Sequence, residues 1–268
     1  MAERTFRVWR GDENGGEFKE YTVEVQPGMV VLDGIHRIQA EHASDLAVRW
    51  NCKAGKCGSC SMEINGKPRL GCMTRLNTFE PGETITVQPI KTFPLIKDLV
   101  TDVSWNFEQN KRIPPVKLKE RDADGNHRMM QEDVDRVQEF RKCIECFLCQ
   151  DVCHVLRDHG KKDEFVGPRF MIRLAQLEMH PLDTVDRVPQ MRKEFGSGWC
   201  NITRCCTEVC PEHIQITDNG IIPMKERVVD RYYDPIAWFL GKVFGGKKKE
   251  APKNAAEPAK AEAADKSE

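Results

Sequence analysis

An α+β protein with two unlike halves is predicted by two patterns in the sequence. Apolar and polar residues alternate through short segments of the first hundred residues, and apolar residues recur at helical spacing after residue 129. Turn residues separate the alternating segments, as is typical of β-hairpins. We therefore predict a β-grasp domain over residues 1–105, a connection over 106–128 and an all-α domain over 129–249.

The N-terminal half is expected to contain two hairpins, a closing strand and one helix. Asn65-Gly66 is the strongest short signal for a two-residue hairpin turn, and Gly15 and Gly16 mark the turn of the first hairpin. The strands are expected at 6–9, 21–25, 61–64, 67–70 and 83–89, and the helix at 29–42. Two hairpins crossed by one helix indicate a β-grasp arrangement.

The C-terminal half follows a polar stretch, 111–128, whose adjacent prolines and lack of periodicity indicate a linker or an ordered connection. Helices are expected around 134–140, 170–177 and 228–232, where apolar residues repeat every three or four positions. Residues 250–268 contain almost no large apolar side chain. They cannot offset the entropy lost on ordering, so we expect a disordered tail.

The charge balance narrows the possible partners. With 41 basic and 42 acidic residues the net charge is -1, which gives no bulk attraction to nucleic acid. Residues 1–16 carry charges throughout and no apolar run, so no secretory signal is expected. No window approaches the roughly 20 apolar residues of a membrane-spanning helix. Work at a membrane would therefore require another chain as the anchor.

Twelve cysteines fall in three tight groups, a pattern that indicates metal or redox chemistry on the reducing side of a membrane. The first group has the spacing Cys-x4-Cys-x2-Cys with one further cysteine, which is the plant-type pattern for [2Fe-2S]. Its members are Cys52, Cys57, Cys60 and Cys72. Zinc is the alternative, although zinc ligands usually come as two Cys-x2-4-Cys pairs.

The second group has the spacing of bacterial ferredoxins, Cys-x2-Cys-x2-Cys-x3-Cys, in which the fourth cysteine serves the other of two clusters. A second run with the same period follows, with Thr203 in the place of its second cysteine. Exchange of the fourth ligands gives one complete set for [4Fe-4S]. That set is Cys143, Cys146, Cys149 and Cys210.

The exchange leaves a third set with only three thiolates, Cys153, Cys200 and Cys206. A missing ligand at one corner is what [3Fe-4S], a cubane that lacks one iron, requires. A [4Fe-4S] cluster with an outside ligand is the alternative, since spacing alone does not fix the number of irons.

Cys205 lies outside both repeats and is interpreted as a small buried side chain, with a reactive thiol as the alternative. Disulfides are a further alternative for the cysteines, and the expected compartment argues against them. Arg141, Lys142 and Arg204 flank the ligands. We expect them to be solvated, although positive charge there would raise the cluster potentials.

Three stretches of the chain resemble the iron-sulfur subunit of succinate dehydrogenase and fumarate reductase. They are residues 49–72, residues 94–102 and the two ferredoxin-like runs, and the resemblance covers roughly residues 1–235. The resemblance implies an N-terminal plant-ferredoxin-like β-grasp domain followed by an all-α, bacterial-ferredoxin-like domain.

The resemblance also implies a function. In this family a flavoprotein subunit oxidises succinate at bound FAD, and electrons pass through [2Fe-2S], [4Fe-4S] and [3Fe-4S] to a quinone. The chain would then be the electron-transfer subunit of a membrane-bound succinate:quinone oxidoreductase of the tricarboxylic acid cycle, with no catalytic residue of its own. An anchor subunit would hold it at the cytoplasmic face of the plasma membrane.

Three alternatives stay open. Quinol:fumarate reductase runs the same reaction in reverse, a soluble thiol-linked fumarate reductase uses other partners, and a free-standing ferredoxin would act alone. The soluble relatives carry Cys-Cys-Gly domains, whereas the Cys-Cys pair of this chain is followed by Thr207.

The sequence departs from the family pattern at the quinone end. Many members have proline after the cysteine that matches Cys153, then tryptophan, and histidine after the one that matches Cys200. Here those places hold His154, Arg157, Asp158 and Asn201. We therefore expect a differently built quinone pocket, with His154, Asn201 and Thr203 near it.

Two histidines and one apolar run can be interpreted as ordinary structural features as well as functional ones. His154 and His159 lack partners at metal spacing and are interpreted as satisfied surface or core histidines. The apolar run at 236–249 ends in lysines and is expected either to contact an anchor subunit or membrane interface or to form an ordinary terminal helix.

Overall fold

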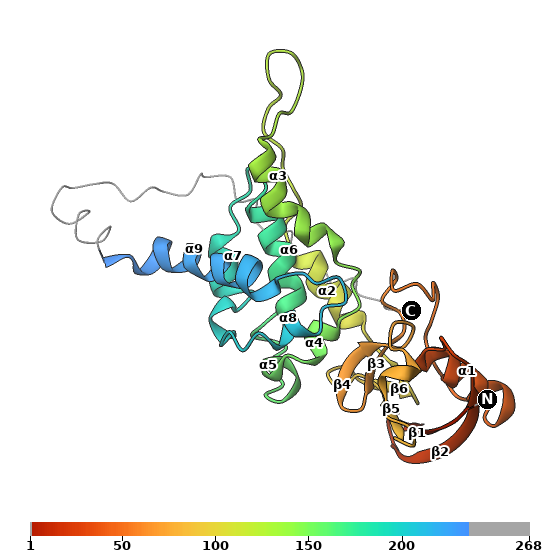
Figure 1. The fold of residues 1–268 in the computed structure, drawn as a ribbon. Helices are drawn as coiled ribbons and strands as arrows, with labels where there is room; N and C mark the ends of the chain where they lie inside the picture. The colour runs from red at the N-terminus through yellow and green to blue at the C-terminus, as the bar shows by residue number, and fades with distance from the viewer. Residues whose placement is uncertain (1, 236–268) are drawn as a thin grey trace, which may run out of the picture. The chain divides into compact units, whose positions relative to one another are not determined.

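The computed structural model describes residues 2–235 of the chain (Figure 1). Residues 1–228 form one compact unit. The expectations for 236–249 and for a disordered tail at 250–268 lie outside the described residues. The division into two domains near residue 105 stays a prediction, and the fold is a β-sheet N-terminal part followed by a helical C-terminal part.

The N-terminal part is built on a seven-stranded sheet among the described residues, in the order β4-β3-β5-β1-β6-β7 with β2 also paired to β1. β1 runs parallel to β5 and antiparallel to β2. The strands are β1 (Ala2–Asp12), β2 (Gly15–Val25), β3 (Ser61–Ile64), β4 (Lys67–Leu70), β5 (Ile85–Gln88), β6 (Leu95–Lys97) and β7 (Val100–Thr101).

Helix α1 (Val31–Glu41) packs its apolar face on this sheet, as its helical spacing predicts. Gly34 brings the helix very close to β1. A Cβ on Gly34 would lie 2.3 Å from Cζ of Phe6, so only glycine fits at this contact. Phe6, Ile35 and Ile38 are fully buried and form part of the core of this domain.

The first hairpin differs from the prediction at its turn. Gly15 and Gly16 belong to β2, where they pair with Asp12 and Gly11 of β1. The turn lies instead at residues 13–14, because the Asp12 carboxylate accepts a hydrogen bond from the Asn14 N–H at 2.8 Å. The two strands are longer than their alternation predicts. The second hairpin has the expected bounds.

The C-terminal part is helical, as expected. Its α-helices are α2 (Ser104–Arg112), α3 (Gln131–Gln138), α4 (Leu148–Asp151), α5 (His154–Arg157), α6 (Pro168–Glu178), α7 (Val188–Lys193), α8 (Cys205–Glu208) and α9 (Ile222–Tyr233). Short 3-10 turns lie at Leu76–Thr78, Glu139–Lys142 and Ser197–Trp199, and a π-helix at Ile216–Ile221.

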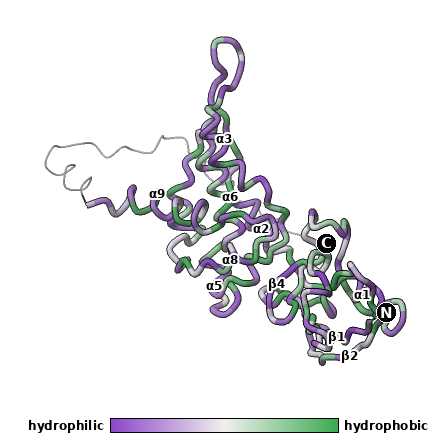
Figure 2. The backbone as a smooth tube through the Cα atoms, in the orientation of Figure 1, coloured by the Kyte–Doolittle hydropathy of each residue, from purple (hydrophilic) through white to green (hydrophobic). Residues whose placement is uncertain are grey.

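The connection expected from residue 106 is helical over its first part, because α2 occupies Ser104–Arg112. The helix was missed because the side chains that it buries, Asn106 and Gln109, are polar and give no apolar period. The Asn106 side-chain oxygen accepts a hydrogen bond from Gln150. The rest of the stretch between α2 and α3 is mostly hydrophilic (Figure 2).

Candidate iron-sulfur cluster sites

The first cysteine set lies around the loop between α1 and β3. Cys52, Cys57 and Cys60 are on the loop, and Cys72 follows β4, whose hairpin returns the chain to it. Backbone N–H groups point at the sulfurs, as the glycine-rich loop suggests. Those of Ala54 and Lys56 lie 3.3 Å from Cys52 Sγ, and the N–H of Cys72 lies 3.4 Å from Cys60 Sγ.

Two thiols of this set, Cys57 and Cys60, have pKa values shifted in opposite directions. Burial raises the pKa of Cys57, but hydrogen bonds from Ser59 and Cys52 outweigh it and lower the pKa to about 6. Burial raises the pKa of Cys60 to about 12, and the neighbouring Cys72 and Cys57 add to the rise. Binding to iron deprotonates a coordinating thiol even where ionisation of the free thiol is costly. The raised pKa of Cys60 is therefore compatible with its role as an iron ligand, and the four cysteines fit a cluster.

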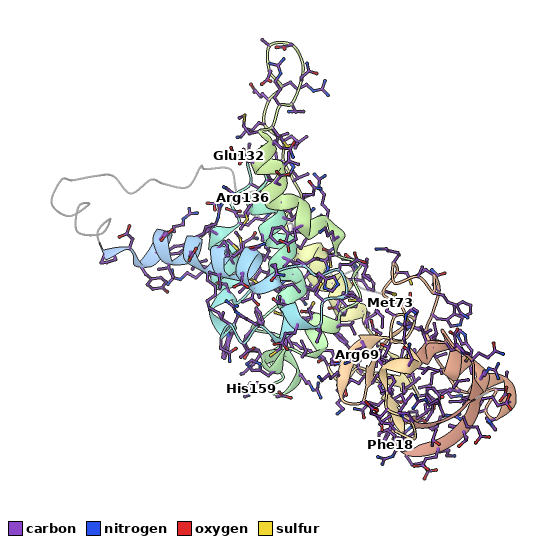
Figure 3. All side chains as sticks on the ribbon, viewed as in Figure 1. Phe18, Arg69, Met73, Glu132, Arg136 and His159 are labelled. Carbon is purple, nitrogen blue, oxygen red and sulfur yellow. The ribbon has the colours of Figure 1, made fainter. Side chains whose placement is uncertain are left out.

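The surface beside this loop carries an exposed methionine, Met73, labelled in Figure 3. Its side chain is 58% exposed and packs over Gly55, where a Cβ would lie 2.7 Å from Met73 Sδ. Gly55 has a φ of +66°, so a side chain there would be strained, and the exposed Met73 side chain would have to move aside. Cys52, on the same loop, is exposed.

The second set meets around a single small cavity of about 20 Å³. All four cysteines that the ligand exchange predicts, Cys143, Cys146, Cys149 and Cys210, line it. Cys149 is buried, and burial raises its pKa well above the usual value, with the neighbouring cysteines adding to the rise. The structure therefore brings the predicted [4Fe-4S] ligands together, and the donor set fits that cluster.

The third set surrounds a separate small cavity of about 20 Å³, lined by Cys153, Cys200 and Cys206 together with Thr203. Burial raises the pKa of Cys153 to about 11, with Cys200 and Cys206 as its charged neighbours. Three thiols and a hydroxyl fit a cluster with one open corner. The nuclearity of this cluster and the individual ligand assignments stay predictions.

The two ferredoxin-like runs share one backbone conformation. Glu145 and Phe147 have left-handed φ values of +56° and +60°, and Ile202 and Arg204, at the same offsets in the second run, have +62° and +65°. This conformation is costly for residues other than glycine, above all for a β-branched isoleucine. The repeat places Thr203 at the position that corresponds to Cys146.

The residues predicted near the quinone lie on the wall of the third cavity. His154, Asn201 and Thr203 all line it, and Asn201 Nδ2 lies 2.7 Å from His154 Nε2. The ring of His154 also contacts that of His159, with centroids 6.2 Å apart. The structure thus groups these side chains beside one cluster site, while their role toward a quinone stays a prediction.

Four residues near the cluster sites were expected to be simply buried, in the case of Cys205, or solvated, in the case of Arg141, Lys142 and Arg204. Cys205 is half-buried rather than buried, and its thiol donates to the Thr203 hydroxyl at 3.2 Å. All twelve cysteines are free thiols. Arg141, Lys142 and Arg204 are exposed, and Arg204 pairs with Asp218 at 2.7 Å.

Spacing alone missed the residues that join the cluster loops of the two halves. Ser61 and Glu63 of β3 contact the chain around the second and third cysteine sets, at Cys146 and Arg157. Both are polar residues that alternate with the buried Met62 and Ile64, and this alternation predicts that their side chains face solvent. Glu63 is fully buried instead.

Comparison with known families supports the cluster sites. Residues 5–108 match the family described as a 2Fe-2S iron-sulfur cluster binding domain. Residues 139–214 match a 4Fe-4S dicluster domain. Within residues 2–235, none of the helices is both long and apolar enough to cross a bilayer.

Similar proteins extend the likeness over most of the chain. A solved structure of the Mycobacterium smegmatis Sdh1 complex in the apo form contains a chain that is 64% identical, with a TM-score of 0.85, covering 88% of this chain and 99% of that one. An uncharacterized iron-sulfur protein of Methanococcus maripaludis is 30% identical over 81% of this chain, which spans only 42% of that protein. The fumarate reductase iron-sulfur subunit of Mycobacterium tuberculosis is 31% identical over 75% of this chain and 82% of its own length. On this likeness, the chain belongs to the family of iron-sulfur subunits of succinate dehydrogenase and fumarate reductase.

Proposed function

We propose that the chain carries electrons between a flavoprotein subunit and a quinone, as the iron-sulfur subunit of a succinate:quinone oxidoreductase. The observation that carries this proposal is the grouping of eleven cysteines into three separate sites within one compact unit. When bound, clusters at such sites each accept and release one electron.

The residues of this chain hold and tune these groups rather than react with succinate. Cys52, Cys57, Cys60 and Cys72 would hold [2Fe-2S], the second set [4Fe-4S], and the third set [3Fe-4S]. Backbone N–H groups directed at Cys52 and Cys60 stabilise the reduced, more negative state at the first site. FAD would belong to the flavoprotein partner.

The third site is proposed to face the quinone and the membrane-anchor subunit. It has the thiol-poor ligand set, and His154, Asn201 and Thr203 line its cavity. Asn201 and Thr203 are exposed, which leaves this wall open to a partner or a ligand. The complex would lie at the cytoplasmic face of the plasma membrane, with this chain attached through the anchor.

Quinol:fumarate reductase is the second candidate, and the name of the Mycobacterium tuberculosis relative favours it. A thiol-linked fumarate reductase is a third, because a chain of the CoM/CoB fumarate reductase of Methanothermobacter marburgensis is 30% identical, and this chain spans 42% of it. The ratio of succinate oxidation to fumarate reduction in the purified complex, with quinone or thiol partners, distinguishes the three.

Iron analysis and EPR spectroscopy of the purified complex test the main proposal. We expect about nine irons per chain, the total of [2Fe-2S], [4Fe-4S] and [3Fe-4S], and a [3Fe-4S] signal before any reductant is added. A flavoprotein and a small membrane protein should copurify. Eight irons in two cubanes, stoichiometric zinc, or isolation of the chain alone would contradict it.

A further inference from the structure

The ligand loops of the first and second cysteine sets touch at Gly58 and Cys146. Gly58 lies between two ligands of the first set, is buried, and has a φ of +69°. A Cβ at this position would lie 2.7 Å from Cα of Cys146 and 2.9 Å from its N. These are backbone atoms that cannot turn aside, so the contact exists only because residue 58 is glycine.

Ser61 joins the same two loops by a hydrogen bond. Its Oγ lies 2.7 Å from the carbonyl oxygen of Cys146 and 2.9 Å from that of Gly58. A hydroxyl has one hydrogen to donate, so the two carbonyls, one from each loop, share it. One side chain therefore fixes the position of a second-set ligand, Cys146, relative to the first-set loop.

Close packing does not hold the loops together on every side of this contact. An open cavity of about 300 Å³ lies beside it, and its lining includes Cys57, Gly58, Ser61 and Cys146. A contact bordered by empty space lacks the surrounding atoms that would otherwise fix it. The Ser61 hydrogen bond and the close approach at Gly58 are thus the restraints that act directly on Cys146, beside an exposed ion pair between Lys56 and Glu212 at 3.1 Å.

We propose that Ser61 is a positioning residue for electron transfer between the first and second cluster sites, acting on Cys146 across the glycine contact. The proposal rests on the proposed function. When clusters are bound, one electron would pass from the cluster held at the first site, which would be oxidised, to the cluster held at the second, which would be reduced. No bond forms or breaks and no proton moves, so the rate depends on how the protein holds the two sites relative to each other.

Four variants in the purified complex test this role. Ser61→Ala removes the shared hydrogen bond, and Ser61→Thr keeps the hydroxyl. Gly58→Ala places a methyl group against the Cys146 backbone. Gly66→Ala is the matched control, because Gly66 also has a left-handed φ, +74°, but nothing lies within 4 Å of its missing Cβ.

The measurement is the magnetic coupling between the two reduced clusters, followed as the microwave power that saturates the [2Fe-2S] EPR signal. We expect Ser61→Ala and Gly58→Ala to saturate at lower power than wild type, with slower passage of electrons to the third cluster. Ser61→Thr and Gly66→Ala should behave as wild type. Iron content is measured in the same samples.

Two failures are distinguishable. If Ser61→Ala keeps the full iron content and the wild-type saturation and electron-transfer rate, the positioning role is wrong while the proposed function stands. If wild-type complex shows no [2Fe-2S] or [4Fe-4S] signal, the proposed function itself fails. Should Gly58→Ala not assemble, the Ser61 pair still decides the matter.

Discussion

Arg157 of α5 lies with its Nη1 3.0 Å from Oε1 of Glu63, a fully buried carboxylate on β3. The other carboxylate oxygen lies 3.4 Å from Nζ of Lys91 and accepts a hydrogen bond from Gln88. Arg157 is one of the departures from the family pattern after Cys153. Its pairing supplies a physical reason for the departure, since it neutralises a charge that the fold has removed from water.

Loss of Arg157 is therefore expected to destabilise the chain strongly. Arg157→Met leaves Glu63 buried beside the Asp151 carboxyl, with the half-exposed Lys91 as its remaining cationic partner, so the free energy of unfolding should fall by about 3 kcal/mol. The measurement is the temperature or denaturant concentration at which cluster absorbance is lost in the purified complex. Lys19→Met is the control, because Lys19 pairs only with an exposed Glu17 at 3.5 Å.

The double variant Glu63→Gln/Arg157→Met distinguishes the effect of losing the charge pair from the effect of losing the packing of the Arg157 side chain. It removes both charges, so it should recover a large part of the stability lost in Arg157→Met. Additive losses would show that the two side chains act independently and that their separation of 3.0 Å carries no coupling.

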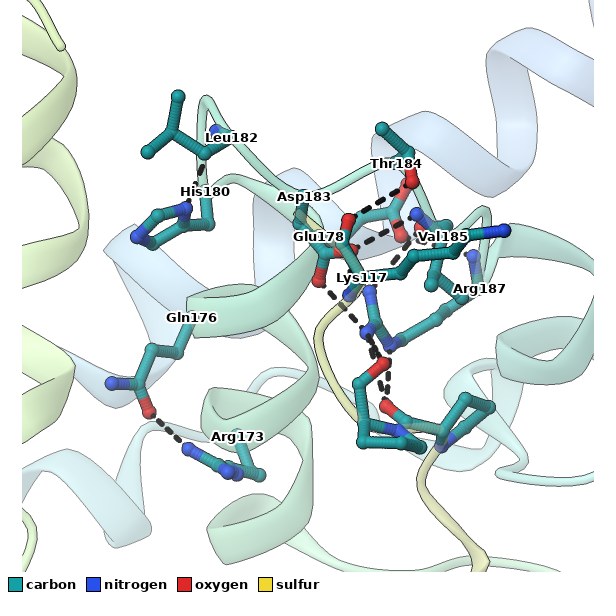
Figure 4. Close-up of polar contacts among 12 residues, drawn as sticks. Lys117, Arg173, Gln176, Glu178, His180, Leu182, Asp183, Thr184, Val185 and Arg187 are labelled. Carbon is teal, nitrogen blue, oxygen red and sulfur yellow. Dashed lines mark hydrogen bonds and ion pairs between the residues drawn. The ribbon is translucent and has the colours of Figure 1, made fainter. Parts of the chain in front are cut away.

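Arg187 forms a second buried pair, within the helical part of the chain (Figure 4). Its Nη2 lies 2.8 Å from Oδ2 of Asp183, and both side chains are almost completely buried. Nε and Nη2 also donate to the carbonyl of Pro114 at 3.1 and 3.0 Å, and Nη2 to that of Pro115. One guanidinium thus satisfies the carbonyls of the proline segment that follows α2.

Replacement of Arg187 should cost more than replacement of a surface arginine or lysine. Arg187→Met strands the Asp183 carboxylate and two carbonyls, and we expect a loss of about 3–5 kcal/mol in unfolding free energy. Lys111→Met is the control, since Lys111 pairs on the surface with Glu108. A loss below about 1 kcal/mol for Arg187→Met would contradict the expected role of the buried pair.

Some parts of the fold were predictable because one local signal determines them. The β3–β4 hairpin has the expected bounds because Asn65-Gly66 specifies a two-residue turn. The α2 helix was not predictable, because its buried residues are amides that contact partners far along the chain, such as Asn106 with Gln150. The spacing of apolar residues along the sequence indicates which positions contact the core, but it does not indicate which polar residues are buried in pairs.

The residues of the candidate sites likewise include some that a local signal predicts and some that it does not. Cysteine spacing predicted three sets, because a cluster requires its ligands at short, fixed intervals, and the cysteines of the second and third sets line two separate cavities. Ser61 and Glu63 were missed, because their importance arises from tertiary contacts. Ser61 and Cys146 are 85 residues apart in sequence, and an isolated serine in a strand has no signature of such a contact.

The His36 side chain should give the chain a measurable pH dependence. Burial lowers the pKa of His36, the nearby Lys53 lowers it further, and Asp33 opposes the shift. A base whose pKa is lower in the folded state stabilises folding fully above its unfolded pKa of about 6.5, and the contribution is lost as pH falls through the folded pKa. Wild type should thus lose stability below about pH 6.5.

The matched variant is His36→Gln, which cannot take up the proton. Its ring contact with Trp50, with centroids 4.8 Å apart, is lost at every pH, so the informative quantity is how the difference from wild type changes with pH. That difference should shrink or reverse between about pH 7.5 and about pH 5.5, measured as the temperature of cluster loss.

Thr203→Cys tests the interpretation of the third site most directly. The left-handed residues on either side place Thr203 where Cys146 stands in the first run, so a thiolate here should complete the set of Cys153, Cys200 and Cys206. We expect the iron content to rise by about one per chain, the oxidised [3Fe-4S] signal to disappear, and the potential of this cluster to fall as a fourth negative ligand is added. Quinone reduction should slow accordingly. Thr203→Ser keeps a hydroxyl in place and should retain the wild-type signal, whereas an unchanged spectrum in Thr203→Cys would show that residue 203 does not face the open corner.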